Sequence, residues 1–298
     1  MSPHKYSLAI CALFVLLLSA CNLGASVSEA TATTLGTLPP AEQSTTAAAA
    51  VVATVNGEAI TRESYNLHLA QYQAALTEAG TLLATENVEQ IVVDDLINRM
   101  LLAQGARTQA FSANDTVVEE RMSKVVENAG GQVAFEEWMT EQGYTAESFR
   151  GELALEIEAG WMRNEITAAV PTTAEQVLAR QILLNESFQA ERLLEQLENG
   201  TPFEQVVVNN DPQRLGTLGW FPRGYLLQSA VEEAAFALQP GEFSQVIETE
   251  LGFHLVEVLD RDPARPLNPQ ARLALQTKAL EDWLEAQRAQ SAIEIFLP

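Results

Sequence analysis

A glycine-bounded aromatic turn directly before a helix constrains the fold of this chain more than any other feature. The segment LGWFPRGYLLQSAVEEAAFALQPGEF (218–243) places two aromatic residues and a proline between Gly219 and Gly224, and a helix-forming run follows. The next run, SQVIETELGFHLVEVLD, alternates apolar and polar residues and predicts a β-hairpin. Helices mixed with a few strands over about a hundred residues indicate a compact α+β domain.

The flanking sequence predicts a second, mostly helical domain. Before the α+β segment, VVATV predicts a strand, Asn56-Gly57 a tight turn, and Thr61 the N-cap of a helix. Apolar periodicity then predicts helices at 86–109, 114–128, 133–142 and 146–166. After the α+β segment, a helix at 268–290 leads into the β-prone run AIEIFLP. Both terminal strands lack another evident partner, so we expect them to pair, with the α+β domain inserted between them.

The N-terminal residues predict export and lipid anchoring. A short basic start precedes an apolar run from Leu8 to Ser19, which is too short to span a bilayer comfortably. The run ends in LLSAC, which resembles the bacterial lipobox, so we expect lipidation of Cys21. The alternative is an ordinary signal peptide with an incidental cysteine. The expected location is extracytoplasmic, lipid-anchored to the bacterial cell membrane.

These patterns together predict the domain organisation. It comprises a lipoprotein signal peptide at 1–20, a disordered tether at 21–50, a helical domain at 51–170, an α+β domain at 171–267, and a C-terminal helix and strand at 268–298 that complete the helical domain. The tether is predicted from its small, polar, alanine- and threonine-rich composition.

Charge and composition exclude several classes of function. A formal net charge of -23 repels nucleic acid, so no nucleic-acid partner is expected. Cys11 lies inside the signal and Cys21 would carry lipid, which leaves no thiol in the mature chain. With His68 and His254 as the only mature histidines, we expect no metal site and no cofactor. The Walker A, dinucleotide-binding and serine-hydrolase motifs are also absent from the sequence.

Several of these segments resemble the SurA/PrsA-like foldases. VVATVNGEAITRESY and VVDDLINRMLLAQGA resemble parts of their helical chaperone domain. The segment LGWFPRGYLL…VEEAAFALQPGEFSQVIETELGFHLVEVLD resembles the second half of a parvulin-type peptidyl-prolyl isomerase domain. The resemblance implies an α+β parvulin-like domain inserted into a SurA-N-like helical chaperone domain formed by both termini.

The resemblance also implies a set of polar site residues. His254 matches the second histidine of the parvulin pair, and Thr249 matches the hydroxyl residue near it. Gln181 stands where the first histidine usually lies, and a glutamine cannot take up a proton in this range. The shortened segment 209–211 leaves Asp211 as the candidate for a further polar catalytic residue. The alternatives are a buried His254 that only supports the fold and a Gln181 that only caps a strand.

Apolar residues complete the implied peptide-binding groove. Leu218, Phe221 and Leu226 match positions around the proline pocket, and Val231 replaces an aromatic residue in the following helix. Trp220 and Phe253 are also assigned to substrate binding. Trp220 and Phe221 form either an exposed platform or a plug for the core, and Glu232-Glu233 is expected to be a solvated helix face.

Two functions follow from the resemblance. The first is an extracytoplasmic, lipid-anchored foldase, a peptidyl-prolyl cis-trans isomerase of the parvulin class whose activity is weakened by the loss of the first histidine. Its partners would be unfolded or proline-containing secreted polypeptides. The alternative is a non-catalytic chaperone or peptide-binding module built on a degenerate parvulin fold.

Overall fold

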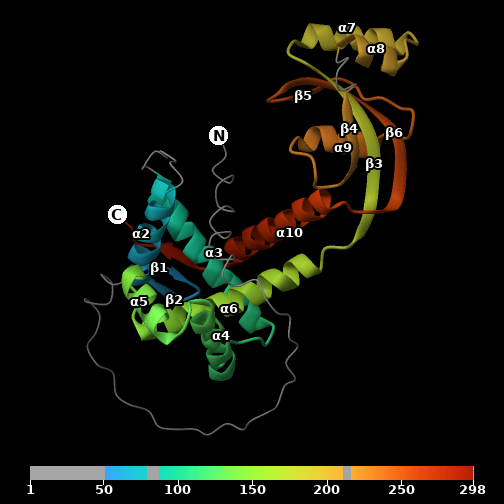
Figure 1. Ribbon diagram of the computed structural model, residues 1–298. Helices are drawn as coiled ribbons and strands as arrows, with labels where there is room; N and C mark the ends of the chain where they lie inside the picture. Colours follow the sequence, from blue (N-terminus) through green and yellow to red (C-terminus); the bar gives the residue numbers. More distant parts are fainter. Residues whose placement is uncertain (1–50, 79–86, 211–215, 298) are drawn as a thin grey trace. The chain divides into compact units, whose positions relative to one another are not determined.

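The computed structural model describes residues 51–78, 87–210 and 216–297. The chain divides into two compact units (Figure 1). Unit 1 extends through Arg163 and resumes at Leu284, whereas unit 2 is the intervening segment Asn164–Trp283. The α+β part of the chain is therefore inserted into a unit that both ends of the described chain build, which confirms the predicted fold class.

A small antiparallel sheet joins the two ends of the chain in unit 1. Its strand order is β2 (Glu58–Thr61), β1 (Val51–Val55), β7 (Ile293–Ile295). Asn56 and Gly57, with φ values of 52° and 85°, form the tight turn between β1 and β2. Pairing of β1 with β7 confirms the prediction that the terminal strands meet. The β1 side chains Val52 and Val55 are fully buried, so the sheet belongs to the core of this unit.

Helices supply the rest of unit 1. The Thr61 hydroxyl accepts a hydrogen bond from Ser64 N at 3.1 Å, which confirms the predicted N-cap. The helix α3 runs through the core and buries ten of its side chains. The helices with residues in this unit are α2 (Arg62–Glu78), α3 (Val88–Thr108), α4 (Asp115–Asn128), α5 (Gln132–Gln142), α6 (Ala146–Ala168) and α10 (Pro269–Gln290).

Unit 2 is built on an antiparallel sheet with the strand order β4-β3-β6-β5. Its strands are β3 (Thr173–Leu184), β4 (Thr217–Pro222), β5 (Ile247–Thr249) and β6 (Gly252–Pro266). Its own helices are α7 (Ser187–Glu198), α8 (Phe203–Asn210) and α9 (Ser229–Ala237), and the segment also includes the end of α6 and α10 as far as Trp283. The long strands β3 and β6 pair from Thr173↔Pro266 to Leu184↔Phe253. The predicted hairpin is confirmed as β5 and β6.

Each face of this sheet carries its own apolar cluster. On one face, α9 packs on side chains that include Val177, Phe221 and Val256; we call this the α9-side cluster. On the other face, α7 and α8 pack on Ile182 and Leu255. Because neighbouring residues of a strand point to opposite faces, Ile182 and Leu255 belong to one cluster while Gln181 and His254 face α9.

The aromatic segment differs from its predicted conformation. Residues 217–222 form strand β4 rather than an isolated turn, with Phe221 opposite Val177 and Trp220 opposite Leu178. Backbone pairing with β3 satisfies the amides of this segment, which a free turn would leave to solvent. The turn follows β4, at residues 223–228, and leads directly into α9.

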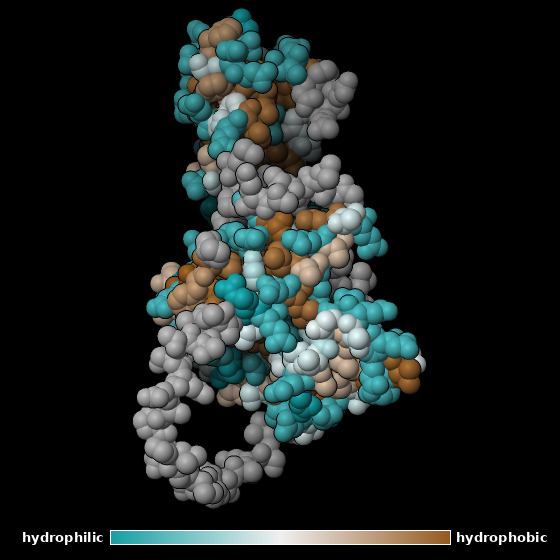
Figure 2. Space-filling view, turned by 90° about the vertical axis from the view of Figure 1, so that its left-hand side faces the viewer, coloured by the Kyte–Doolittle hydropathy of each residue, from teal (hydrophilic) through white to brown (hydrophobic). Residues whose placement is uncertain are grey.

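One face of the molecule is drawn in Figure 2. Hydrophilic residues and patches of hydrophobic residues both appear on it. Among the described residues, no helix combines the length and the apolar content needed to cross a membrane.

Candidate active site

Three predicted polar residues meet on the α9 side of the sheet in unit 2. The Nδ1 atom of His254, on β6, lies 2.9 Å from Oε1 of Gln181, on β3. The Nε2 atom of His254 lies 2.8 Å from the Thr249 hydroxyl, at the end of β5. We call this Gln181–His254–Thr249 arrangement the polar chain. Antiparallel register brings the three residues together. His254 lies opposite Leu183 of β3 and Ile247 of β5, and Gln181 and Thr249 are each two residues from those positions, on the same face of the sheet.

The hydrogen bonds of the polar chain run in one direction. Leu251 N donates to the Thr249 hydroxyl oxygen at 3.1 Å, and the hydroxyl then donates to Nε2 of His254. Nδ1–H of His254 donates to Gln181 Oε1. In the neutral ring, the Gln181 oxygen beside Nδ1 places the proton on Nδ1 and leaves Nε2 as the acceptor. Burial agrees with this state, because desolvation lowers the pKa of His254 below its ordinary value.

Two glycines allow the backbone to close around the polar chain. Gln181 N donates to Gly216 O at 2.8 Å, and a Cβ on Gly216 would lie 2.0 Å from the Gln181 carbonyl oxygen. A Cβ on Gly252 would lie 2.3 Å from the Leu184 carbonyl oxygen. Both glycines also have positive φ, so no other residue fits these positions without moving β3.

The members of the polar chain differ in their access to solvent. His254 is 2% exposed, whereas Gln181 and Thr249 are partly exposed. Gln181 and Thr249 are therefore the members of the polar chain with surface open to solvent. Two exposed leucines lie near the polar chain: Leu183, on β3 opposite His254, is 44% exposed, and Leu251, in the turn of the β5–β6 hairpin, is 58% exposed.

The predicted apolar site residues divide between the two faces of the sheet. Phe221 and Val231 are buried in the α9-side cluster, and Leu218 and Leu226 pack against it. Phe221 has no exposed surface and meets Phe236 edge-on at 6.0 Å between ring centroids. Phe221 is therefore a core plug and not an exposed platform, which resolves the two interpretations of that residue.

Trp220 and Phe253 do not join this group. Trp220 alternates with Phe221 in β4, and Phe253 alternates with His254 in β6, so both side chains point to the face opposite the polar chain. The guanidinium of Arg265 lies 4.1 Å from the Trp220 ring centroid. This stacking gives Trp220 a partner that the sequence did not suggest.

Glu232 has a role that the sequence interpretation missed. Its carboxylate accepts hydrogen bonds from Gly224 N at 2.6 Å, Tyr225 N at 2.9 Å and Leu226 N at 3.0 Å. The expectation that Glu232 belongs to a solvated helix face is therefore wrong, although Glu233 is exposed. An acidic residue in the first turn of a helix that directly follows a glycine-containing loop is the sequence signal for such a contact.

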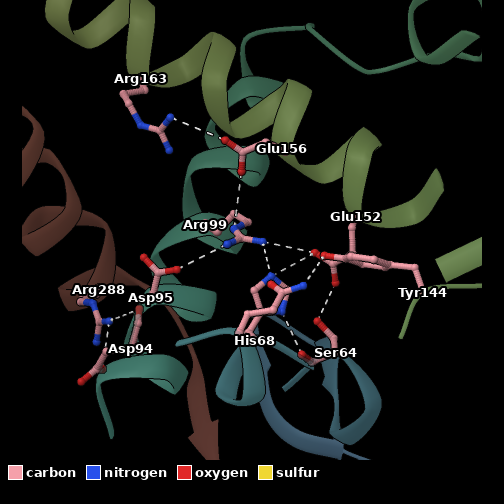
Figure 3. Close-up of polar contacts among 11 residues, drawn as sticks. Ser64, His68, Asp94, Asp95, Arg99, Tyr144, Glu152, Glu156, Arg163 and Arg288 are labelled. Carbon is pink, nitrogen blue, oxygen red and sulfur yellow. Dashed lines mark hydrogen bonds and ion pairs between the residues drawn. The ribbon is translucent and has the colours of Figure 1, made fainter. Parts of the chain in front are cut away.

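Unit 1 contains a second polar cluster, which is shown in Figure 3. Arg99, on α3, donates to Nε2 of His68 at 2.9 Å and forms ion pairs with Glu152 at 3.2 Å and Asp95 at 3.4 Å. His68 Nδ1–H donates to the Ser64 carbonyl oxygen at 2.8 Å. Desolvation first, and then the charge of Arg99, lower the pKa of His68. This cluster ties α2, α3 and α6 together.

Two predicted site residues lie outside the described part of the chain: Cys21, the expected lipidation site, and Asp211, the expected polar catalytic residue. Within residues 51–78, 87–210 and 216–297, no group of His, Cys, Asp and Glu side chains has the arrangement of a metal site.

Comparison with protein families matches most of the chain. A model of the SurA-like N-terminal domain matches residues 10–163, and a model of the PPIC-type PPIase domain matches residues 184–260. The chain belongs to the SurA/PrsA-like family. The PPIase match includes Glu232, Thr249 and His254, whereas Gln181 lies three residues before its first matched position.

Individual relatives agree with the family assignment. The foldase protein PrsA of Caldanaerobacter subterraneus subsp. tengcongensis is 27% identical over 238 residues, which are 70% of this chain and 72% of that protein. The chaperone SurA of Thiobacillus denitrificans is 25% identical, and the match covers 71% of this chain and 56% of that protein. The chaperone SurA of Bordetella avium is 38% identical over 147 residues, or 42% of this chain and 29% of that protein. The chain thus spans only part of these relatives.

Solved structures give partial matches. The peptidylprolyl isomerase PrsA from Bacillus anthracis is 18% identical with a TM-score of 0.42, covering 64% of this chain and 94% of that chain. The parvulin of Nitrosopumilus maritimus is 27% identical with a TM-score of 0.27, covering 29% of this chain and 98% of that chain.

Proposed function

We propose that this SurA/PrsA-like protein is an extracytoplasmic foldase that binds proline-containing segments of unfolded secreted chains and isomerises their X-Pro bonds. The observation that carries the proposal is the polar chain, in which Gln181 takes the place of a histidine and keeps the hydrogen bond to His254. Rotation about a peptide bond has a barrier of about 18–20 kcal/mol, and X-Pro isomers exchange over tens to hundreds of seconds without help.

Gln181 is the group that we propose to act on the peptide. Its Oε1 atom accepts from His254 and the residue is partly exposed, and we infer that its amide nitrogen donates to the peptide. A donor in this position can stabilise the carbonyl of a twisted amide, which has lost conjugation with its nitrogen. His254 and Thr249 act as positioning residues, because their hydrogen bonds fix the orientation of the Gln181 amide.

The proline ring would pack on the apolar side chains at the edge of the α9-side cluster. Leu218 and Leu226 are partly buried there and keep some surface accessible. We retain these two residues as substrate-binding, with Phe221 and Val231 supporting them from the core. We do not include Trp220 and Phe253 among the substrate-binding residues, because their side chains point to the face of the sheet opposite the polar chain.

Substitution of Gln181 tests this proposal directly. Gln181→Met removes the donor at similar length, and we expect kcat/KM for a proline-containing peptide to fall about tenfold. Gln181→His supplies the missing ring and should raise turnover. It should also make turnover pH-dependent between about pH 5 and 8, where histidine titrates, whereas the wild type should be flat because its donor does not titrate. Gln196→Met, on the exposed face of α7, is the matched control.

The non-catalytic alternative is a peptide-binding module, and the replacement of a histidine by Gln181 favours it. This alternative predicts that the wild type binds the peptide, and that neither the wild type nor Gln181→His isomerises it. Turnover by the wild type that falls in Gln181→Met and is unchanged in Gln196→Met would exclude this alternative.

We further propose that Cys21 carries a lipid that holds the protein at the bacterial membrane. The proposed segments are the signal peptide at 1–20, the tether at 21–50, the helical domain at 51–170 with its completion at 268–298, and the α+β domain at 171–267. The support is the LLSAC sequence and the small, polar composition that follows it. Cys21→Ser should move the protein from the membrane fraction to the soluble fraction. A Cys21→Ser variant that remains in the membrane fraction would contradict the anchor.

A further inference from the structure

The turn between β4 and α9, residues 223–228, is held by one side chain. We call this segment the clamp loop. Three consecutive amides of the loop, those of Gly224, Tyr225 and Leu226, converge on the carboxylate of Glu232. Gly224 N meets Oε1, and the other two amides meet Oε2. Hydrogen bonds to an ionised acceptor are stronger than neutral ones, so this carboxylate fixes the loop backbone far better than solvent would.

The conformation held by Glu232 determines where two leucines point. Leu226 packs against the α9-side cluster, next to the position proposed for the proline ring. Leu227, the following residue, is 92% exposed and is the most exposed of the large hydrophobic residues in the described chain. A free loop would turn Leu227 inward or vary its position, since exposure of a large apolar side chain is unfavourable.

We infer that Glu232 is a positioning residue that holds the clamp loop so that Leu226 and Leu227 form an apolar rim for the bound peptide. The inference rests on the proposed function and deepens it, because such a rim fits a segment in which an apolar residue lies beside the proline. Glu232 itself touches no peptide and acts only through the loop backbone.

This role predicts a change in binding and not in the chemical step. Gln in place of Glu232 keeps the size of the side chain but has one acceptor oxygen in place of two. At least one of the three hydrogen bonds is therefore lost, and those that remain lose their ionised acceptor. For Glu232→Gln we expect the Kd of a proline-containing apolar peptide to rise about tenfold. Turnover at saturating peptide should change less than twofold, because Gln181 and His254 are untouched. A residue that only stabilised the fold would not separate KM from kcat in this way.

The experiment combines peptide titration, isomerase kinetics and amide hydrogen exchange on the full chain. Glu233→Gln is the matched control, since Glu233 is the exposed neighbour of Glu232 in α9. We expect Glu232→Gln to lose exchange protection at Gly224, Tyr225 and Leu226 and to bind peptide more weakly, with no change in Glu233→Gln. Leu227→Ser leaves the clamp intact, so it should weaken peptide binding even if Glu232→Gln fails to fold.

The outcomes distinguish the inference from the proposed function. A wild type that binds no peptide would overturn the proposed function, and the inference with it. Peptide binding by Glu232→Gln at wild-type affinity after loss of loop protection would overturn the inference alone, as would full protection of the loop in that variant. Unchanged binding by Leu227→Ser would show that the rim does not contact the peptide.

Discussion

The two units each hold one histidine largely away from solvent, and they stabilise it in opposite ways. In unit 1, His68 lies among charges, with Arg99 at 2.9 Å and Glu152 at 3.8 Å. In unit 2, His254 lies between neutral groups, the Gln181 amide and the Thr249 hydroxyl. Both pKa values are lowered, His68 by desolvation and then by Arg99, and His254 by desolvation.

The two histidine clusters also differ in what they join and in their access to solvent. The charges around His68 join three helices, and removal of any one of them leaves a poorly solvated partner. The neutral polar chain joins a hairpin to β3, and its outer member Gln181 reaches solvent. A neutral donor beside an apolar patch suits a peptide carbonyl, whereas a charged one would require its own counter-ion.

The largest expected effect comes from removing the central cation of unit 1. Arg99→Met leaves Asp95, Glu152 and Glu156 without the guanidinium that joins them, and we expect the free energy of unfolding to fall by about 3 kcal/mol. Urea denaturation measures the loss. Arg163→Met is the control, because Arg163 meets Glu156 at 3.7 Å and should cost about 1 kcal/mol or less. Equal losses in the two variants would show that the cluster has no central member.

The next largest effect is expected from a substitution that breaks the polar chain of unit 2. Gln181→Met leaves the buried Nδ1–H of His254 without its acceptor, at an expected cost of about 2 kcal/mol. Hydrogen exchange should localise the loss to unit 2 and leave amides of α3 protected. If Gln181→Met and Gln196→Met have equal free energies of unfolding, the Gln181–His254 hydrogen bond does not stabilise unit 2.

The pH dependence compares the two histidines directly. Each folded-state pKa lies below the unfolded value of about 6.5, so the unfolded chain binds the proton first and stability falls as the pH drops below that value. Each histidine contributes a slope of at most about 1.4 kcal/mol per pH unit, which ends below its folded pKa. His68→Gln and His254→Gln should each flatten the stability curve between about pH 5 and 7 relative to the wild type. A curve that keeps the wild-type slope in both variants would assign the acid sensitivity to carboxylates.

An NMR titration sharpens that comparison. Because Arg99 contributes to the lowered pKa of His68, Arg99→Met should raise the pKa of His68. The pKa of His254, whose cause is desolvation, should not change. Parallel movement of both values would mean that the variant loosens the whole chain.

The smallest effect is expected for an exposed ion pair of unit 2. Lys278 and Asp282 lie 2.8 Å apart, but their side chains are 50% and 57% exposed. Asp282→Asn should change the free energy of unfolding by only about 0.3 kcal/mol. A loss comparable to that of Arg99→Met would show that exposure does not decide the strength of these pairs.

Local sequence was sufficient for most of the elements and for the pairing of the terminal strands, but not for β4, which was predicted as a turn. Asn56-Gly57 gives a turn because these residues accept positive φ, and Thr61 caps a helix with its own hydroxyl. The β-prone runs at both ends lacked local partners, which predicted the β1–β7 pair. These features depend on backbone preferences and on apolar period, both of which are visible in a few consecutive residues.

Tertiary structure alone decided which side chains meet. Gln181 and His254 are 73 positions apart, and only the register of β3 against β6 places them on one face and sends Phe253 to the other. The burial of Phe221, the Glu232 clamp and the Arg99 cluster likewise depend on packing between distant segments. A side chain's partner is set by three-dimensional position, and a shift of one residue in a strand would exchange the two faces. The sequence therefore determined most of the elements, while the fold decided β4 and the site.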